Sequence, residues 1–198
     1  MQYTQIPTDT FQKLQLNAGV LVKSFAPSTG TITDIIAATS GGVSFTATPT
    51  FSDWGEDIDN APHNTKELKR LDSWDVSLTG SFVTVDSTVA KLLVGAGDTT
   101  TNSGIGKITP RNDIALTDFE DIWWIGDYSD VNDTSANNSS AGFMAIHMLN
   151  SLSTGGFSMQ SSDRAKGTFA FTFTGHYSIN AQDTVPFEIY VKAGVAGA

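Results

Sequence analysis

The sequence predicts a mainly β fold: an antiparallel β-sandwich or barrel-like domain with one lateral α-helix and a long charged loop. Apolar and polar residues alternate with a period of two in several segments, and Gly, Ser, Asn and Asp punctuate the stretches between them. Only one segment has clear helical spacing. Strands at short intervals with a single helix favour a β-sheet domain over a layered α/β unit.

The first strand that the pattern defines spans residues 43–51. Its apolar positions recur at every second residue up to Phe51. Pro49 falls within this run, and proline cannot donate a hydrogen bond to a neighbouring strand, so Pro49 predicts an edge strand or a bulge. A second strand spans residues 74–82, with Gly80 on its apolar face. The apolar side chains of this second strand are Trp74, Val76, Leu78 and Phe82.

The helix follows the second strand directly. Asp86 or Ser87 can cap its first turn, and Gly95 or Gly97 can end it. Helical spacing places four apolar side chains on one stripe, which we expect to pack on the sheets. These are Val89, Leu92, Leu93 and Ala96.

Three later segments complete the predicted β structure. Residues 143–149 are continuously apolar, which indicates a strand buried on both faces. Residues 169–179 and 187–191 alternate again, and we expect these two runs to pair with each other. In a strand, Trp123 and Trp124 would face opposite sides, so one of them needs cover from a loop or a neighbouring subunit.

Length and composition indicate one domain over residues 1–198 without disulfides. The chain has 198 residues, no cysteine and a net charge of −10. The N-terminus lacks a basic and apolar leader and no window is apolar enough to cross a membrane, so we expect a cytosolic or particle-bound protein. Residues 112–163 contain no Lys or Arg. That acidic region is expected to repel DNA.

An extended loop at about residues 52–72 is the candidate interaction site. Loops this long in compact domains are usually functional or disordered. Its acidic residues precede its basic ones, and Trp54, Ile58 and Leu68 are its only large apolar anchors. A loop with this charge split suits docking onto another copy of the chain. The predicted inter-subunit residues are Asp53, Trp54, Glu56, Asp57, Asp59, Lys66, Lys69 and Arg70.

Residue patterns for catalysis and metal binding are lacking, so we expect neither an enzyme nor a cofactor. His147 lies in an apolar run and is typical of a core histidine, while His63 and His176 are remote from it in sequence. The every-third spacing of Asp127, Asp130 and Asp133 differs from that of calcium loops. The pairs Glu120/Asp121 and Asp57/Asp59 are sequence neighbours, which does not show the separation that a glycosidase needs.

Several short blocks, in order along the chain, resemble the major tail tube protein of long-tailed, non-contractile bacteriophages. The first blocks are residues 41–45, Pro49, residues 55–59 and residues 64–66. The later blocks are residues 123–128, 175–177 and 186–189. The resemblance spans nearly the whole chain, and the order of the blocks is its specific part.

This resemblance implies a structural virion protein that forms stacked, hexameric rings. The rings would make the tail tube, which is assembled in the bacterial host cytoplasm and through which genomic DNA passes without specific binding. It implies sheets joined across subunits and a long loop that bridges rings. Partners would be copies of the chain and the tape measure, tail tip and terminator proteins. The alternative is a soluble β-sandwich binding module for carbohydrate or another surface ligand, and a hydrolase is a third.

Overall fold

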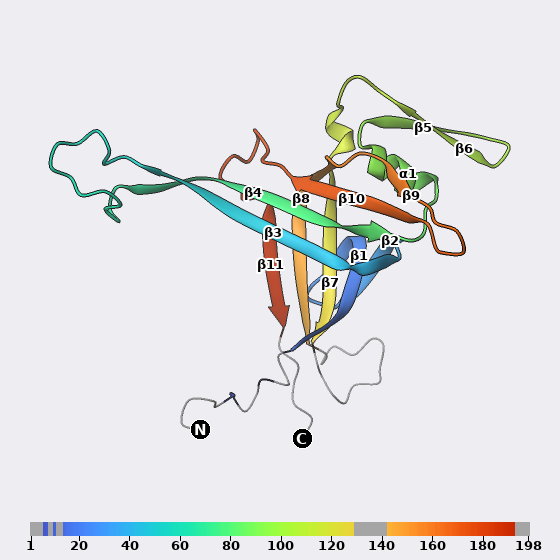
Figure 1. The fold of residues 1–198 in the computed structure, drawn as a ribbon, viewed down its shortest axis with the longest axis horizontal. Coiled ribbons are helices and arrows are strands. Elements are labelled where there is room, and N and C mark those ends of the chain that lie inside the picture. The colour runs from blue at the N-terminus through green and yellow to red at the C-terminus, as the bar shows by residue number, and fades with distance from the viewer. Residues whose placement is uncertain (1–5, 8–9, 11–13, 129–141, 193–198) are drawn as a thin grey trace.

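The protein has a mainly β fold of antiparallel strands with one lateral α-helix in the described residues (Figure 1). The computed structural model describes residues 6–7, 10, 14–128 and 142–192. The elements in chain order are β1 (Gln15–Ala26), β2 (Thr31–Ala37), β3 (Thr39–Asp53), β4 (Lys69–Phe82), α1 (Ser87–Val94), β5 (Gly97–Asn102), β6 (Ile105–Pro110), the 3-10 turn η2 (Leu116–Asp118), β7 (Glu120–Tyr128), β8 (Phe143–Ser153), β9 (Ser158–Gln160), β10 (Thr168–Gly175) and β11 (Phe187–Lys192).

The main sheet is open and folds over itself in a sandwich-like arrangement. Its strand order is β2-β1-β7-β8-β10-β4-β3, so β2 and β3 are its two ends. Strand β11 pairs with β8, and β9 pairs with β10. Strands β5 and β6 form a separate two-stranded sheet beside α1 (Figure 1). The predicted β-sandwich class with one lateral helix is therefore confirmed.

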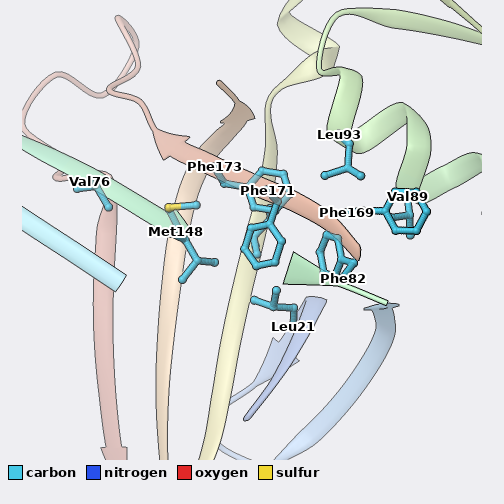
Figure 2. Packing of buried hydrophobic residues seen from close by; sticks show 11 residues of the cluster. Leu21, Val76, Phe82, Val89, Leu93, Met148, Phe169, Phe171 and Phe173 are labelled. Carbon is cyan, nitrogen blue, oxygen red and sulfur yellow. The ribbon is translucent and has the colours of Figure 1, made fainter. Parts of the chain in front are cut away.

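The main core lies between the two halves of this sheet and α1. Phe82 of β4 is fully buried and stacks on Phe171 of β10 with ring centroids 4.4 Å apart. Figure 2 shows Leu93 and Val89 of α1 reaching the same cluster. Its buried members are Leu21, Val76, Leu78, Phe82, Val89, Leu93, Ile122, Met148, Phe169, Phe171 and Phe173.

The predicted helix is confirmed at both ends. The Asp86 carboxylate accepts a hydrogen bond from the Val89 amide at 2.7 Å, which satisfies a free donor of the first turn. Gly95 follows the last helical residue with φ of 76°, a left-handed conformation that glycine adopts without strain. Val89 and Leu93 are the buried residues of the predicted stripe.

The predicted strands at 43–51 and 74–82 are confirmed as parts of β3 and β4. Strand β3 is an end strand, and its register with β4 shifts between Thr50 and Phe51, one residue beyond Pro49. Both features agree with the prediction from that proline. Gly80 lies on the buried face, where an added Cβ would be 2.6 Å from the Phe171 ring. Only glycine leaves room for that ring.

Two predictions about the C-terminal strands are wrong. Strand β10 ends at Gly175, so Tyr177 and Ile179 lie outside it, and Ile179 is exposed. Strand β10 pairs with β4, β8 and β9, whereas β11 pairs with β8 and not with β10. Alternation in sequence identifies a strand and its faces, but it contains no information about which strand lies alongside.

The predicted run 143–149 is confirmed as the first part of β8, and none of its residues is exposed. The two neighbouring tryptophans of β7 face opposite sides, as expected. Trp123 is buried with Val22, Ile125 and Ala145 in a second cluster. Trp124 is half-buried and donates its indole Nε1 hydrogen to the Ala18 carbonyl at 3.0 Å. The described part of this chain therefore supplies cover for Trp124.

Candidate functional site

A hairpin of β3 and β4 extends well beyond the body of the protein (Figure 1). The strands pair out to Asp53 opposite Lys69. We call residues 50–72 the arm and residues 54–68, which connect the two strands, its tip. The predicted loop at about 52–72 is therefore shorter than expected, since Asp53, Lys69 and Arg70 belong to strands. Neither face of this part of the hairpin is buried, so its sequence lacks the alternation that indicates a strand.

The tip is organised by its own hydrogen bonds. The two carboxylate oxygens of Asp53 accept hydrogen bonds from the Gly55 amide at 2.9 Å and from the Asn64 amide at 2.8 Å. These bonds stabilise the ionised carboxylate and lower the pKa of Asp53. The Trp54 amide also donates to the Leu68 carbonyl at 3.1 Å. Asp53 therefore links the two sides of the tip at its base through these hydrogen bonds.

Aromatic and apolar side chains of the arm are exposed, and cations lie over two of them. The Arg70 guanidinium lies 4.2 Å from the centre of the Trp54 ring, and the Lys69 ammonium lies 5.8 Å from that of Phe51. Phe51 is paired across the strands with Leu71. Trp54 is 61% exposed, Phe51 52% and Leu71 50%. Side chains of this kind, outside any core, are typical of contact surfaces.

The charges of the arm are arranged differently from the predicted split. Because the hairpin folds back, the basic residues Lys69 and Arg70 lie beside Asp53 and Ser52 at the base of the tip. Lys66, on the tip, pairs with its neighbour Glu67 at 3.4 Å, and both side chains are exposed. What remains at the surface of the tip is an acidic group of side chains: Glu56, Asp57 and Asp59.

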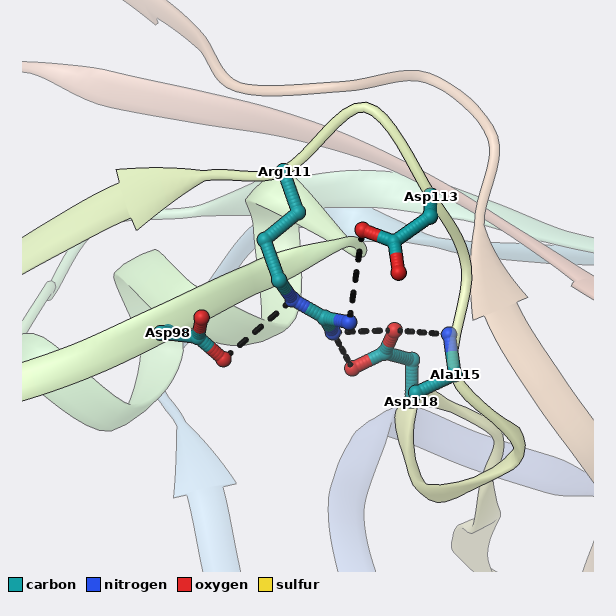
Figure 3. Close-up of polar contacts among 5 residues, drawn as sticks. All are labelled: Asp98, Arg111, Asp113, Ala115 and Asp118. Atoms are coloured by element: carbon teal, nitrogen blue, oxygen red, sulfur yellow. Dashed lines mark hydrogen bonds and ion pairs between the residues drawn. The ribbon is translucent and has the colours of Figure 1, made fainter.

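A second charged group, which the sequence did not predict, surrounds Arg111 (Figure 3). Its guanidinium contacts Asp118 at 2.6 Å, Asp98 at 3.2 Å and Asp113 at 3.9 Å. Asp118 is buried and also accepts a hydrogen bond from the Ala115 amide at 2.9 Å. These carboxylates come from β5, the loop after β6 and η2, so the group fastens the β5–β6 hairpin to the body.

The pKa values in this group follow from these contacts. Burial opposes ionisation of both partners, but the Ala115 amide and the Arg111 guanidinium outweigh it and lower the pKa of Asp118. The pKa of Arg111 is raised in turn, because its hydrogen bond to Asp118 and three nearby carboxylates outweigh its desolvation. Spacing alone could not reveal the group, since Asp98 and Asp118 are brought together by the β5–β6 hairpin and the loop that follows it.

His147 lies at a third group, formed by three neighbouring strands. Its ring stacks on Trp123 at 3.9 Å with an angle of 8°, and its side chain is 13% exposed. The two ring nitrogens lie 3.3 Å from Asp121 and 3.4 Å from Glu188. His147 is therefore mostly buried, but it belongs to neither core cluster and lies between two partly exposed carboxylates. A hydrogen bond from His147 lowers the pKa of Asp121, and one from Tyr190 lowers the pKa of Glu188.

A cavity of about 260 Å³ lies between α1 and the strands β1 and β7. Three of its four charged lining residues are paired: Lys23 contacts Glu120, and Asp118 contacts Arg111. Lys91 is the fourth, and a single lysine does not define a ligand site. Its lining residues are Lys23, Ser87, Thr88, Lys91, Leu92, Gly95, Thr99, Asp118 and Glu120.

The other histidines and the aspartates with every-third spacing do not form a shared site in the described residues. His63 is exposed on the tip, and His176 packs edge-on against Phe119, remote from the tip in the fold. Asp127 ends up on β7, while Asp130 and Asp133 lie outside the described residues.

Among residues 6–7, 10, 14–128 and 142–192, no group of three or more His, Asp or Glu side chains could hold a metal ion. Within the same ranges, no helix has the length and apolarity needed to span a membrane. Comparison with protein-family models and with curated proteins gives no match for this chain.

Proposed function

We propose that this protein is a structural subunit that assembles with copies of itself, as the tail tube subunit of a long-tailed, non-contractile bacteriophage. The observation that supports this most directly is the arm, which projects from the body and has exposed aromatic residues at its end. In a monomer, such a projection would leave apolar surface in water without a gain in stability. Contact with another subunit would bury that surface.

The edges of the sheet support the same proposal. Within the described residues β2, β3, β9 and β11 each pair on one side only. Unpaired strand edges are templates for pairing with other chains, and soluble monomers usually protect them. On β11, Ile189 and Val191 are also more than half exposed. Head-to-tail contacts between unlike surfaces generate rings or open stacks, which a tube requires.

The charge distribution fits a conduit for DNA. The chain is strongly acidic, and β7, β8 and β9 all fall within residues 112–163, which contain neither Lys nor Arg. Binding to DNA depends largely on phosphate contacts from Lys and Arg. A wall built from such strands would let DNA slide past. Proposed partners are copies of the chain in stacked hexameric rings and the tape measure, tail tip and terminator proteins, in a virion tail assembled in the bacterial cytoplasm.

A soluble β-sandwich binding module is the second candidate. One observation favours it: Trp54 is 61% exposed and lies near the carboxylates of the tip, an arrangement that also suits carbohydrate. In that case the purified protein would remain a monomer.

Negative-stain electron microscopy and sedimentation of the purified full-length chain over a range of concentrations distinguish the two candidates. Rings or tubes that grow with concentration are the expected result. Two results together would refute the assembly proposal in favour of the binding module. The protein would stay monomeric at all concentrations, and it would bind glycans on an array in a way that is lost in Trp54→Ala.

A further inference from the structure

The acidic tip lies at one end of the long axis of the molecule, and a basic loop lies toward the other end, near the β5–β6 hairpin (Figure 1). The tip lies at one extreme of the view in Figure 1, and residues 161–167, which join β9 to β10, lie toward the other. The tip presents the carboxylates of Glu56, Asp57 and Asp59 together with exposed Trp54 and Ile58. It therefore combines negative charge with apolar surface.

The end with the basic loop has the complementary composition. Arg164 and Lys166 are exposed on the 161–167 loop. Beside this loop, in the part of the chain that the structure describes, β9 pairs with β10 alone, so its outer edge is open. Phe157 and Met159, next to and within β9, are 48% and 60% exposed. This surface, which we call the β9 surface, joins cations to exposed apolar side chains and an unpaired strand edge.

Most other cations of the described chain already have contacts. Lys23 and Arg111 contact carboxylates of the body, and Lys69 and Arg70 lie over aromatic rings of the arm. Arg164, in contrast, has only its neighbour Asp163 at 3.8 Å, and both side chains are more than 90% exposed. An exposed pair at that distance contributes little. The β9 surface is thus available to an acidic partner.

We propose that the β9 surface is the docking site for the arm tip of a second copy of this chain. This inference rests on the proposed function, which supplies the second copy, and it adds the surface that receives the arm. The tip carboxylates would face Arg164 and Lys166, while Trp54 and Ile58 would cover Phe157 and Met159. Apolar contact supplies most of the attraction, and the charges set the orientation.

The tip and the β9 surface differ, so the contact joins unlike surfaces. Between copies in the same orientation the contact is heterologous: it leaves a free tip at one end and a free β9 surface at the other, and copies add head to tail, without limit unless the rotation closes a ring. Two copies in opposite orientations would instead satisfy both contacts in a closed dimer, which cannot grow into a tube.

Disulfide trapping tests this contact directly, because the natural chain has no cysteine. Asp57→Cys and Lys166→Cys are prepared as separate full-length variants, mixed and oxidised. The expected result is a cross-linked dimer in the mixture and little in either variant alone. Lys107→Cys on β6, an exposed lysine outside the β9 surface, is the matched control and should not cross-link to Asp57→Cys.

Charge exchange provides an independent readout. At low ionic strength, Lys166→Glu should raise the concentration for half-maximal assembly by roughly two- to five-fold, as expected for loss of exposed ion pairs. Lys107→Glu changes the net charge equally and should have no such effect. Adding Glu56→Lys to the Lys166→Glu chain should restore assembly.

The outcomes separate this inference from the proposed function. Tubes that form normally, with no mixed cross-link and no effect of Lys166→Glu, would refute the β9 surface as the docking site and leave the tube proposal intact. Cross-linking of Asp57→Cys with itself would show that tips meet tips, which also refutes the inference. A mixed cross-link without rings or tubes would support the contact and refute the tube.

Discussion

The two halves of β4 belong to one strand and yet have opposite roles. In the half inside the body, Val76, Leu78 and Phe82 are at most 2% exposed, whereas Leu71 in the arm half is 50% exposed. Both halves pair with β3 in the same antiparallel ladder. The difference is that the rest of the sheet and α1 cover one face of the body half, whereas no other described element covers either face of the arm half. Strand pairing by itself contributes little stability, and burial of a face decides which half belongs to the core.

This comparison predicts the largest loss of stability for Phe82→Ala. Phe82 is fully buried and stacks on Phe171. Its removal should lower the free energy of unfolding by about 3 to 5 kcal/mol. Leu71→Ala, on the same strand, should change it by less than about 1 kcal/mol. Urea denaturation followed by circular dichroism measures both, and equal losses would show that the arm is part of the core.

The Arg111 group predicts a second loss within the body. Asp118→Asn removes the charge of a buried carboxylate while Arg111 stays in place, so a desolvated guanidinium loses its closest partner. The melting temperature should fall. Asp113→Asn is the matched control, because Asp113 is exposed and 3.9 Å from the guanidinium, and it should have little effect. If both substitutions leave the melting temperature unchanged, the group does not fasten the β5–β6 hairpin.

Acid should weaken the body through the carboxylates whose pKa values are lowered. Folded Asp118, Asp121 and Glu188 have lowered pKa values, so the folded chain binds fewer protons than the unfolded chain as the pH falls. The stability that they contribute is complete above the unfolded pKa, about pH 4, and is lost as the pH falls through the folded pKa.

Denaturation midpoints between pH 7 and pH 3 check this, with Asp121→Asn as the informative variant. It should lose part of the acid-dependent slope, since the hydrogen bond from His147 is the main cause of the lowered pKa of Asp121. Asp127→Asn, at an exposed position on the same strand, is the matched control for the loss of one carboxylate. An unchanged slope in Asp121→Asn would contradict the stabilising role of the contact.

The smallest effect on folding is expected from replacing the tip. A chain in which residues 54–68 become a short Gly-Ser linker should unfold within about 1 kcal/mol of the natural chain, because the tip has no part in the buried clusters. It should nevertheless form no tubes. Thermal melting and electron microscopy of the same preparation measure both properties. Tubes of normal length would show that the tip is dispensable for assembly.

The sequence by itself determined the elements that depend on local chemistry. Alternation located β3, β4 and β10, because each has one face against the core and one toward water. The cap at Asp86 and the left-handed Gly95 set the ends of α1, since both act within one turn of the chain. Pro49 marked an edge because it lacks an amide hydrogen, whatever surrounds it.

Only the tertiary structure decided which strands are neighbours and where the arm begins. The pairing of β11 with β8, the meeting of Arg111 with Asp98 and Asp118, and the extension of β3 to Asp53 all depend on the path of the chain in space. Paired strands with both faces in water have no burial pattern, so the arm appeared in sequence as a charged loop. Periodicity shows whether a residue faces the core or the solvent, but it does not show which residue of another strand lies beside it.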